Sequence, residues 1–274
     1  MKHKISVLNL TNRYGGIDIL WANMKRQTEQ DFELVIVDAL WREREQEIKD
    51  YVNDSRLVYV RQNDKADGAF TNLAHADNQG FKACTGELIV CLQDYIWIPP
   101  EGLSKFWFHH KRLKGKALIG GVGDQYVKPD PTDIVDLKGK ITIFEKPYTK
   151  RPEVVIYSDP HKRSEFGTFY ECYPPDWELN YCCIPNAIIH ELGGMDEQYD
   201  FEGFAYDNAN IALRADMLGY KSYLDQTNEC MGFDHDSWWP NPLKVNKVSP
   251  TEYHIKVLDE MKRGVRPIRL PYLD

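Results

Sequence analysis

Short apolar runs alternate with amphipathic segments in the first part of the chain. Residues 5–10 predict a first strand, and residues 32–37 form a near-continuous apolar run typical of a strand buried on both faces. Residues 57–60 and 87–92 predict two more strands. Helices are predicted at residues 17–29, 41–52, 70–83 and 101–113. This alternation predicts an α/β fold with a mainly parallel sheet flanked by helices.

The pattern changes after residue 115. Gly120-Gly121-Val122-Gly123 indicates a loop, and residues 134–145 predict a hairpin that turns at Lys138-Gly139-Lys140. Residues 146–180 are rich in Pro, Tyr and Trp and show little periodicity, which is typical of an irregular segment that shapes a substrate site. Further helices are predicted at residues 184–192, 207–218 and 250–263.

Composition and net charge indicate which binding partners and which cellular compartment to expect. The 274 residues have an ordinary globular composition, and the net charge of −8 disfavours nucleic acid as a partner, although two short basic clusters permit it. No apolar run is long enough to cross a membrane, and the start of the chain resembles a strand more than a signal peptide, which predicts a cytoplasmic protein. The six cysteines show no CxxC spacing and are expected to be reduced, mostly buried thiols.

Two acidic residues follow predicted strands. Asp38 comes directly after residues 32–37, and Asp94 comes after residues 87–92 and shortly before Pro99-Pro100. Ligands of parallel α/β sheets bind beyond the carboxyl ends of the strands. Asp38 is therefore a candidate for contacting a nucleotide, or a helix cap. Asp94 is a candidate ligand of Mg²⁺ or Mn²⁺, which prefer carboxylate oxygens, or an acidic residue of a turn.

A late acidic stretch carries the next candidates. Residues 191–220 gather several carboxylates before a predicted helix that begins at Asp207. Crowded carboxylates raise one another's pKa, so Asp207 is a candidate general base, or else the N-cap of that helix. His235 lies between Asp234 and Asp236, and is either a metal ligand or an ordinary hydrogen-bonded histidine.

Four segments together resemble the family 2 glycosyltransferases, whose fold is called GT-A. In order they are VLNLTNRYGGIDILWANMKRQT, FELVIVDAL, TNLAHADNQGFKACTGELIVCLQDYIWIPP and LGGMDEQYDFEGFAYDNANIALR. The resemblance covers residues 4–103 and 180–225. It implies a nucleotide-sugar-binding half at residues 1–115, an irregular acceptor-binding and catalytic half of the same domain at residues 116–240, and a C-terminal tail with a helix at residues 241–274.

The resemblance also implies an inverting, metal-assisted transfer of a sugar from a UDP- or GDP-type donor to a hydroxyl acceptor. Asp207 would be the catalytic base, and Asp94 with His235 would hold Mn²⁺ or Mg²⁺. The acceptor would contact Trp177, Glu202 and Gly203. Residues expected to bind the donor are Thr11, Asn12, Arg13, Asp38, Asn78, Gln93 and Asp94.

Several positions depart from the family's pattern, because single acids stand where the family carries two or three. The metal motif is Gln93-Asp94-Tyr95, the second strand ends in Asp38-Ala39, and the late pair is Asp207-Asn208. Two alternatives therefore stay open, a nucleotidyltransferase on a related fold and a catalytically inactive protein that binds sugar nucleotides.

Overall fold

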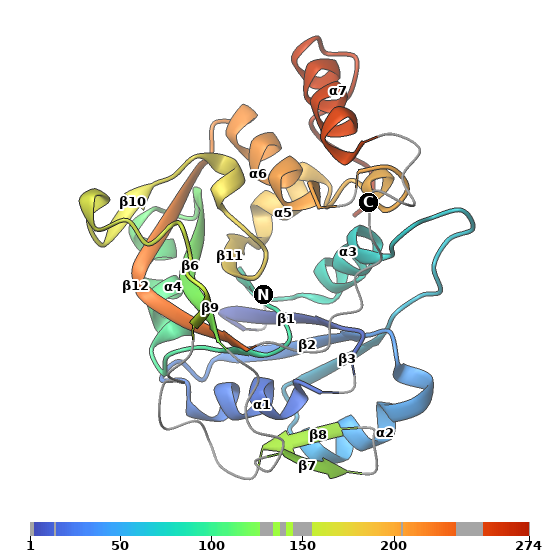
Figure 1. Ribbon diagram of the computed structural model, residues 1–274, viewed down its shortest axis with the longest axis vertical. Coiled ribbons are helices and arrows are strands. Elements are labelled where there is room, and N and C mark those ends of the chain that lie inside the picture. Colours follow the sequence, from blue (N-terminus) through green and yellow to red (C-terminus); the bar gives the residue numbers. More distant parts are fainter. Residues whose placement is uncertain are drawn as a thin grey trace.

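The computed structural model describes residues 3–13, 15–126, 134–137, 141–144, 155–203, 205–233 and 249–273. Within these residues, ten strands form one mixed sheet in the order β10-β12-β6-β11-β4-β1-β2-β3, with β5 paired to β12 and β9 paired to β6 (Figure 1). Its strands are β1 (Ile5–Thr11), β2 (Phe32–Asp38), β3 (Leu57–Arg61), β4 (Leu88–Leu92), β5 (Ile96–Trp97), β6 (Ala117–Tyr126), β9 (Val155–Tyr157), β10 (Phe169–Glu171), β11 (Tyr181–Pro185) and β12 (Lys221–Phe233).

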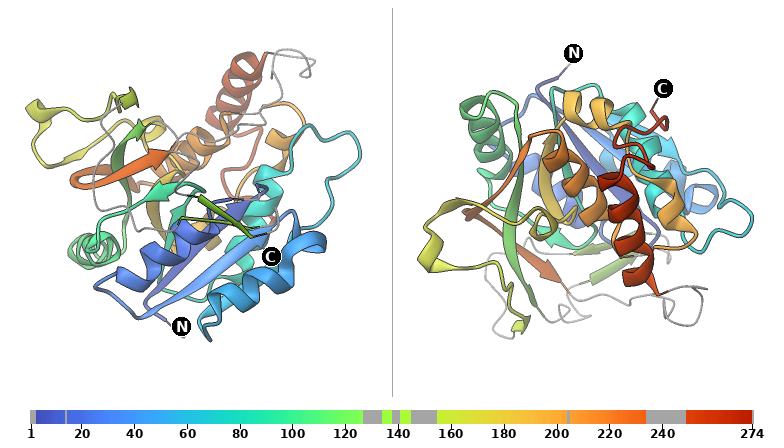
Figure 2. Two further views of the ribbon diagram at one scale, coloured as in Figure 1. Left: turned by 60° about the horizontal axis from the view of Figure 1, so that its bottom comes forward. Right: turned by 90° about the horizontal axis from the view of Figure 1, so that it is seen from above.

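Helices cover both faces of this sheet (Figures 1 and 2). In β2, Leu34 and Ile36 join the core cluster that includes α1, α2 and α4, whereas Val35 and Val37 join the cluster that includes α3, α5 and α6. This alternation explains why residues 32–37 are apolar throughout. The helices are α1 (Ile17–Arg26), α2 (Trp41–Val52), α3 (Leu73–Ala83), α4 (Gly102–Arg112), α5 (Asn186–Leu192), α6 (Asp207–Met217) and α7 (Pro250–Lys262).

The first half of the predicted fold is confirmed. β1 pairs in parallel with β2 and β4, and β2 pairs in parallel with β3. Beyond β4 the sheet changes direction, because β11 runs antiparallel to both β4 and β6. The parallel strands therefore end at one edge, where the residues that follow β1, β2 and β4 come together.

One prediction for the later part is wrong, because Gly120-Gly121-Val122-Gly123 lies inside β6 and not in a loop. The helix predicted at residues 184–192 is present as α5, although it starts at Asn186, after β11. The glycines of β6 reflect close strand packing, since a Cβ at Gly121 would collide with Tyr181 and one at Gly123 with Cys230. β11 and β12 were not predicted from the sequence.

Other expectations agree with the structure. β7 (Ile134–Leu137) and β8 (Ile141–Phe144) pair antiparallel, as the predicted hairpin requires, while its turn at 138–140 lies outside the described residues. All six cysteines are free and buried. Among the described helices, none has the length and apolar character that a membrane span requires.

Candidate functional site

Two pockets lie beyond the carboxyl ends of the parallel strands and meet at Gln93 and Asp94, which line both. The large pocket, of about 390 Å³, is lined by the ends of β1 and β4, the start of α3 and the segment after β3. The small pocket, of about 240 Å³, is lined by β6, β12 and the segments around β9 and β11. Because the two pockets share residues, groups bound in each would meet beside Asp94.

Asp94 follows β4 and has a side chain that is only 2% exposed. Its closest charged neighbour is Arg13, whose Nη1 lies 3.5 Å from Oδ2 of Asp94. Neither Asp94 oxygen accepts a hydrogen bond from the described residues. Burial raises the pKa of Asp94 to about 6, and the charges of Arg13 and Arg44 limit this rise. A buried carboxyl group without a hydrogen-bond donor is suited to bind a cation or polar groups of a ligand.

The backbone around Asp94 is constrained. Tyr95 has a φ of 61°, in the left-handed region that is uncommon for a bulky side chain. On the opposite side, Gly16 has a φ of 98°, and a Cβ there would lie 3.4 Å from Oδ1 of Asp94. Strained backbone persists where its surroundings fix it. The close approach of these segments therefore holds Asp94 at the junction of the two pockets.

Asp38 ends β2, but its carboxylate is already used by protein groups. It accepts hydrogen bonds from Arg44 (Nη2 at 2.8 Å, Nε at 3.0 Å), from the Tyr59 hydroxyl at 2.5 Å and from the main-chain N–H of Leu40 at 2.8 Å. The side chains of Asp38 and Arg44 are both 0% exposed. Ala39 lines the large pocket instead. The hydrogen bonding of Asp38 therefore does not support its predicted contact with a nucleoside, which stays a prediction.

Arg44 links this ion pair to the turn after β1. Its Nη2 donates to the hydroxyl of Thr11 at 3.0 Å, and its Nη1 donates to the main-chain oxygen of Arg13. Thr11, Asn12 and Arg13, which the sequence analysis proposed as donor contacts, all line the large pocket. Asp38 therefore acts on the pocket through Arg44, by holding the turn that carries Arg13.

Asp200 fixes the start of α3, which forms another wall of the large pocket. Its Oδ1 accepts from the Thr71 hydroxyl at 2.6 Å and from the N–H groups of Leu73 at 2.7 Å and Ala74 at 3.1 Å, while Oδ2 accepts from the N–H of His75 at 2.9 Å. These N–H groups have no partner inside the helix, and a negative charge is favourable at a helix N-terminus. Asp200 is thus a helix cap supplied from a distant loop.

Asp200→Ala is expected to lower the free energy of unfolding by about 2 kcal/mol, because it leaves the first turn of α3 without its cap. Urea denaturation followed by circular dichroism measures this loss. Asp200→Asn is the matched control, since it keeps one acceptor oxygen and should cost less. A loss below about 0.5 kcal/mol for Asp200→Ala, the size of an ordinary surface substitution, would contradict the capping role.

Asp207 begins α6 and is 6% exposed. Its Oδ2 has no hydrogen-bond partner among the described residues. Burial raises the pKa of Asp207 to about 6, main-chain N–H groups limit the rise, and the charge of Asp200 adds to it. Asn208 lines the large pocket, whereas Asp207 is not among the residues that line either pocket. A carboxyl group of this pKa is suited to accept a proton, and its predicted role as a base stays a prediction.

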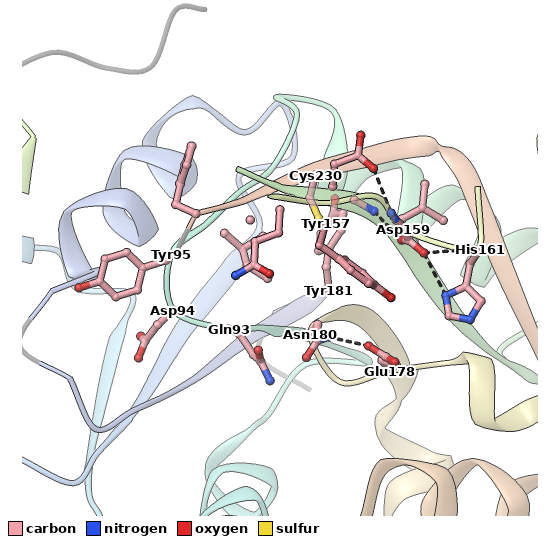
Figure 3. Close-up of a pocket in the computed structure, with 18 of the residues that line it drawn as sticks. Gln93, Asp94, Tyr95, Tyr157, Asp159, His161, Glu178, Asn180, Tyr181 and Cys230 are labelled. Atoms are coloured by element: carbon pink, nitrogen blue, oxygen red, sulfur yellow. Dashed lines mark hydrogen bonds and ion pairs between the residues drawn. The ribbon is translucent and has the colours of Figure 1, made fainter. Parts of the chain in front are cut away.

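Charged side chains line the far side of the small pocket (Figure 3). Nδ1 of His161 lies 3.0 Å from Oδ1 of Asp159, and its Nε2 lies 3.5 Å from Oδ1 of Asp176. The hydrogen bond to Asp159 raises the pKa of His161. Close by, Nζ of Lys162 lies 2.7 Å from Oδ2 of Asp124. The wall of this pocket therefore offers many hydrogen-bonding groups, as a hydroxyl-rich ligand requires.

The three predicted acceptor contacts lie away from the described walls of both pockets. Trp177 is 0% exposed and belongs to the hydrophobic core. Glu202 is exposed, and Gly203 is packed so closely that a Cβ would collide with Tyr199 and Tyr253. An acceptor cannot reach a side chain that has no exposed area, so the structure does not support the prediction for Trp177.

Asn78 has a structural role, and its predicted contact with a donor stays a prediction. Its Nδ2 donates to the main-chain oxygen of Met195 at 3.1 Å and to Oε1 of Glu197 at 2.9 Å, and its Oδ1 accepts from the N–H of Met195 at 2.7 Å. These bonds tie α3 to the loop after α5 and engage the Nδ2 group of the amide twice. The other predicted metal ligand, His235, lies outside the described residues.

Several residues of the two pockets were not predicted from the sequence. Asp77 precedes Asn78 and lines the large pocket, and its position four residues after Leu73 places both on one face of α3. That spacing is a signal in the sequence. Asp159 and His161 carry no such signal, because they come from a segment without periodicity and meet only through the fold.

Among the described residues, Asp94 is the candidate ligand of a divalent cation. In the part of the chain that the structure describes, no three His, Cys, Asp or Glu side chains gather as a metal site. Mg²⁺ often binds through one or two carboxylates together with phosphate oxygens of the substrate. The buried carboxylate of Asp94 fits such an ion, with the remaining ligands supplied by the substrate.

Comparisons with known proteins bear on this site. The family model described as "Glycosyl transferase family 2" matches residues 8–170. The solved structure of GalNAc-T7 with UDP, GalNAc and Mn²⁺ aligns with 99% of the chain, at a TM-score of 0.65 and 17% identity, and the chain spans 53% of that protein. This likeness shows a GT-A fold. Chitinase-like protein 1 of Arabidopsis thaliana is 30% identical over 82 residues, which are 30% of this chain and 24% of that protein.

Proposed function

Since the chain belongs to glycosyl transferase family 2, we propose that it transfers a sugar from a nucleotide-sugar donor to a hydroxyl group of an acceptor. The observation that carries this proposal is the pair of pockets that meet at Asp94. The large pocket, at the strand ends, would hold the donor, and the small pocket would hold the acceptor. The solved GT-A structure that contains UDP, GalNAc and Mn²⁺ supports a nucleotide sugar and a divalent cation.

Different residues of the donor pocket would bind the diphosphate and its cation. Arg13, in the turn after β1, carries a positive charge to the junction, and Lys65 carries another to the same pocket. Together they would bind the diphosphate oxygens. Asp94 would hold Mg²⁺ or Mn²⁺, which neutralises negative charge that develops on the departing diphosphate. These groups would stabilise the nucleoside diphosphate as it leaves in a single displacement that inverts the anomeric carbon.

We expect Asp207 to take the acceptor's proton. A base works in its ionised form, and the pKa of Asp207 is about 6, so the transfer rate should rise with pH, reach half its maximum near pH 6 and level off above it. Asp207→Asn should keep donor affinity and lower transfer about a hundredfold or more. Stopped assays of released nucleoside diphosphate measure the rate, and Asp216→Asn, an exposed acid near the end of α6, is the control. Full activity in Asp207→Asn would disprove this assignment.

The proposed function is tested by calorimetric titration with UDP, GDP and a set of their sugar conjugates, with Mn²⁺ and with a chelator. Cation-dependent binding of one nucleotide class would support the proposal and identify the donor class. Absence of binding to every ligand would refute it.

A second candidate rests on Asn208. An amide, and not a second carboxylate, lines the pocket beside Asp207. A protein that binds sugar nucleotides without consuming them would show tight binding in the titration and no release of nucleoside diphosphate with any acceptor.

A further inference from the structure

Asp77 is a buried acid of the donor pocket to which the mechanism above gives no role. It lines the pocket, and the whole residue is 5% exposed. A mostly buried carboxyl group at the wall of a pocket points to a polar partner on the ligand.

The neighbours of Asp77 place it at one end of the pocket. Leu179, just before β11, and Asn208, on α6, line the pocket with it, and the charge of Asp207 acts on it. Gln62, which follows β3, lies across the sheet, because β2, β1 and β4 separate β3 from β11. Asp77 therefore lies at the end of the pocket next to the proposed base.

The middle of the pocket holds two of the groups proposed to act on the diphosphate and its cation. Arg13 and Asp94 follow β1 and β4, the central strands of this edge. With the diphosphate there, the nucleoside and the sugar would occupy opposite ends. The sugar must lie near the base, so the end that contains Asp77 and Asn208 suits the sugar.

The surroundings favour the neutral form of Asp77. Burial, followed by the charges of Asp207 and Asp200, raises the pKa of Asp77 well above the ordinary carboxyl range. If Asp77 is neutral, the charged side chains that line this pocket are Arg13, Lys65 and Asp94. Their net charge is positive, which favours binding of an anionic diphosphate. A carboxylic acid both donates and accepts a hydrogen bond.

We propose that Asp77 and Asn208 bind the hydroxyl groups of the donor's sugar and thereby select the sugar that is transferred. A sugar hydroxyl also donates and accepts, so it can satisfy either side chain. This inference rests on the proposed function, because it presumes a nucleotide-sugar donor.

The test compares sugar nucleotides with the bare nucleoside diphosphate. Isothermal titration of the full chain uses UDP, UDP-glucose, UDP-N-acetylglucosamine, GDP and GDP-mannose. Asp77→Ala should weaken binding of the preferred sugar nucleotide about tenfold and leave the affinity for its nucleoside diphosphate unchanged. Asp77→Asn, whose amide also donates and accepts, should stay within about threefold of the unmodified chain. Asn208 lies on α6, and Asn208→Ala should likewise weaken binding of the sugar nucleotide and leave the affinity for the nucleoside diphosphate unchanged.

The outcomes separate the two proposals. Nucleoside diphosphate binding by the unmodified chain tests the donor site by itself, and its absence would overturn both. If that binding is intact and both alanine variants keep full affinity for the sugar nucleotide, the inference alone fails. Equal weakening of nucleotide and sugar nucleotide would also overturn it, because the contact would then lie on the nucleotide. Loss of turnover in Asp77→Asn with unchanged donor affinity would identify an ionised base and overturn the neutral hydrogen-bonding role.

Discussion

Asp94→Ala is expected to abolish cation-dependent binding of the donor and to lower the transfer rate by about a hundredfold or more. The side chain is buried, carries no hydrogen bond from the described residues and lies where the two pockets meet. Its removal takes away the single described carboxylate at this junction that is positioned for a cation beside the diphosphate. Calorimetry with Mn²⁺ and with a chelator measures the first effect, and release of nucleoside diphosphate measures the second.

Two variants make the result specific. Asp94→Asn keeps the shape of the side chain and removes its charge, so it should lose cation-dependent binding as the alanine variant does. Asp259→Ala removes a carboxylate that pairs with Arg263 on the exposed side of α7, and it should change neither property. If Asp94→Ala bound the donor equally well with Mn²⁺ and with chelator, and as tightly as the unmodified chain with Mn²⁺, the role assigned to Asp94 would be wrong.

Asp38→Ala is expected to lower the free energy of unfolding by about 3–5 kcal/mol, the range for removing one partner of a buried ion pair. Arg44 would keep its charge in a site with no exposed area, and its hold on the turn at Thr11 would weaken. Donor affinity should fall with it, although Asp38 itself does not line the pocket. Urea denaturation measures the stability, and titration with nucleoside diphosphate measures the affinity.

The double variant Asp38→Ala/Arg44→Met is the matched control. It removes both charges, so it should be more stable than Asp38→Ala alone. Tyr59→Phe removes one hydrogen bond to Asp38 and should cost about 1 kcal/mol. A cost below about 1 kcal/mol for Asp38→Ala would contradict the role of this pair in stability.

The sequence predicted the parts of this protein that depend on local pattern. The apolar run at residues 32–37 predicted a strand buried on both faces, because the side chains of a strand alternate between faces and both faces are covered by helices. The position of Asp94 after such a strand predicted its place at the sheet edge. Periodicity and strand ends are properties of neighbouring residues, so a single sequence contains them.

The tertiary structure decided what depends on residues far apart in the chain. Gly121 lies in a strand where Tyr181 leaves no room for a side chain, a contact that local pattern does not reveal. Trp177 resembles a sugar-binding aromatic in the sequence, yet packing places it in the core. Asp38 and Asp77 are both acids near the same pocket. Asp38 accepts hydrogen bonds from Arg44 and lines no pocket, whereas Asp77 lines the large pocket, because burial and hydrogen bonding are set by the fold and not by residue type.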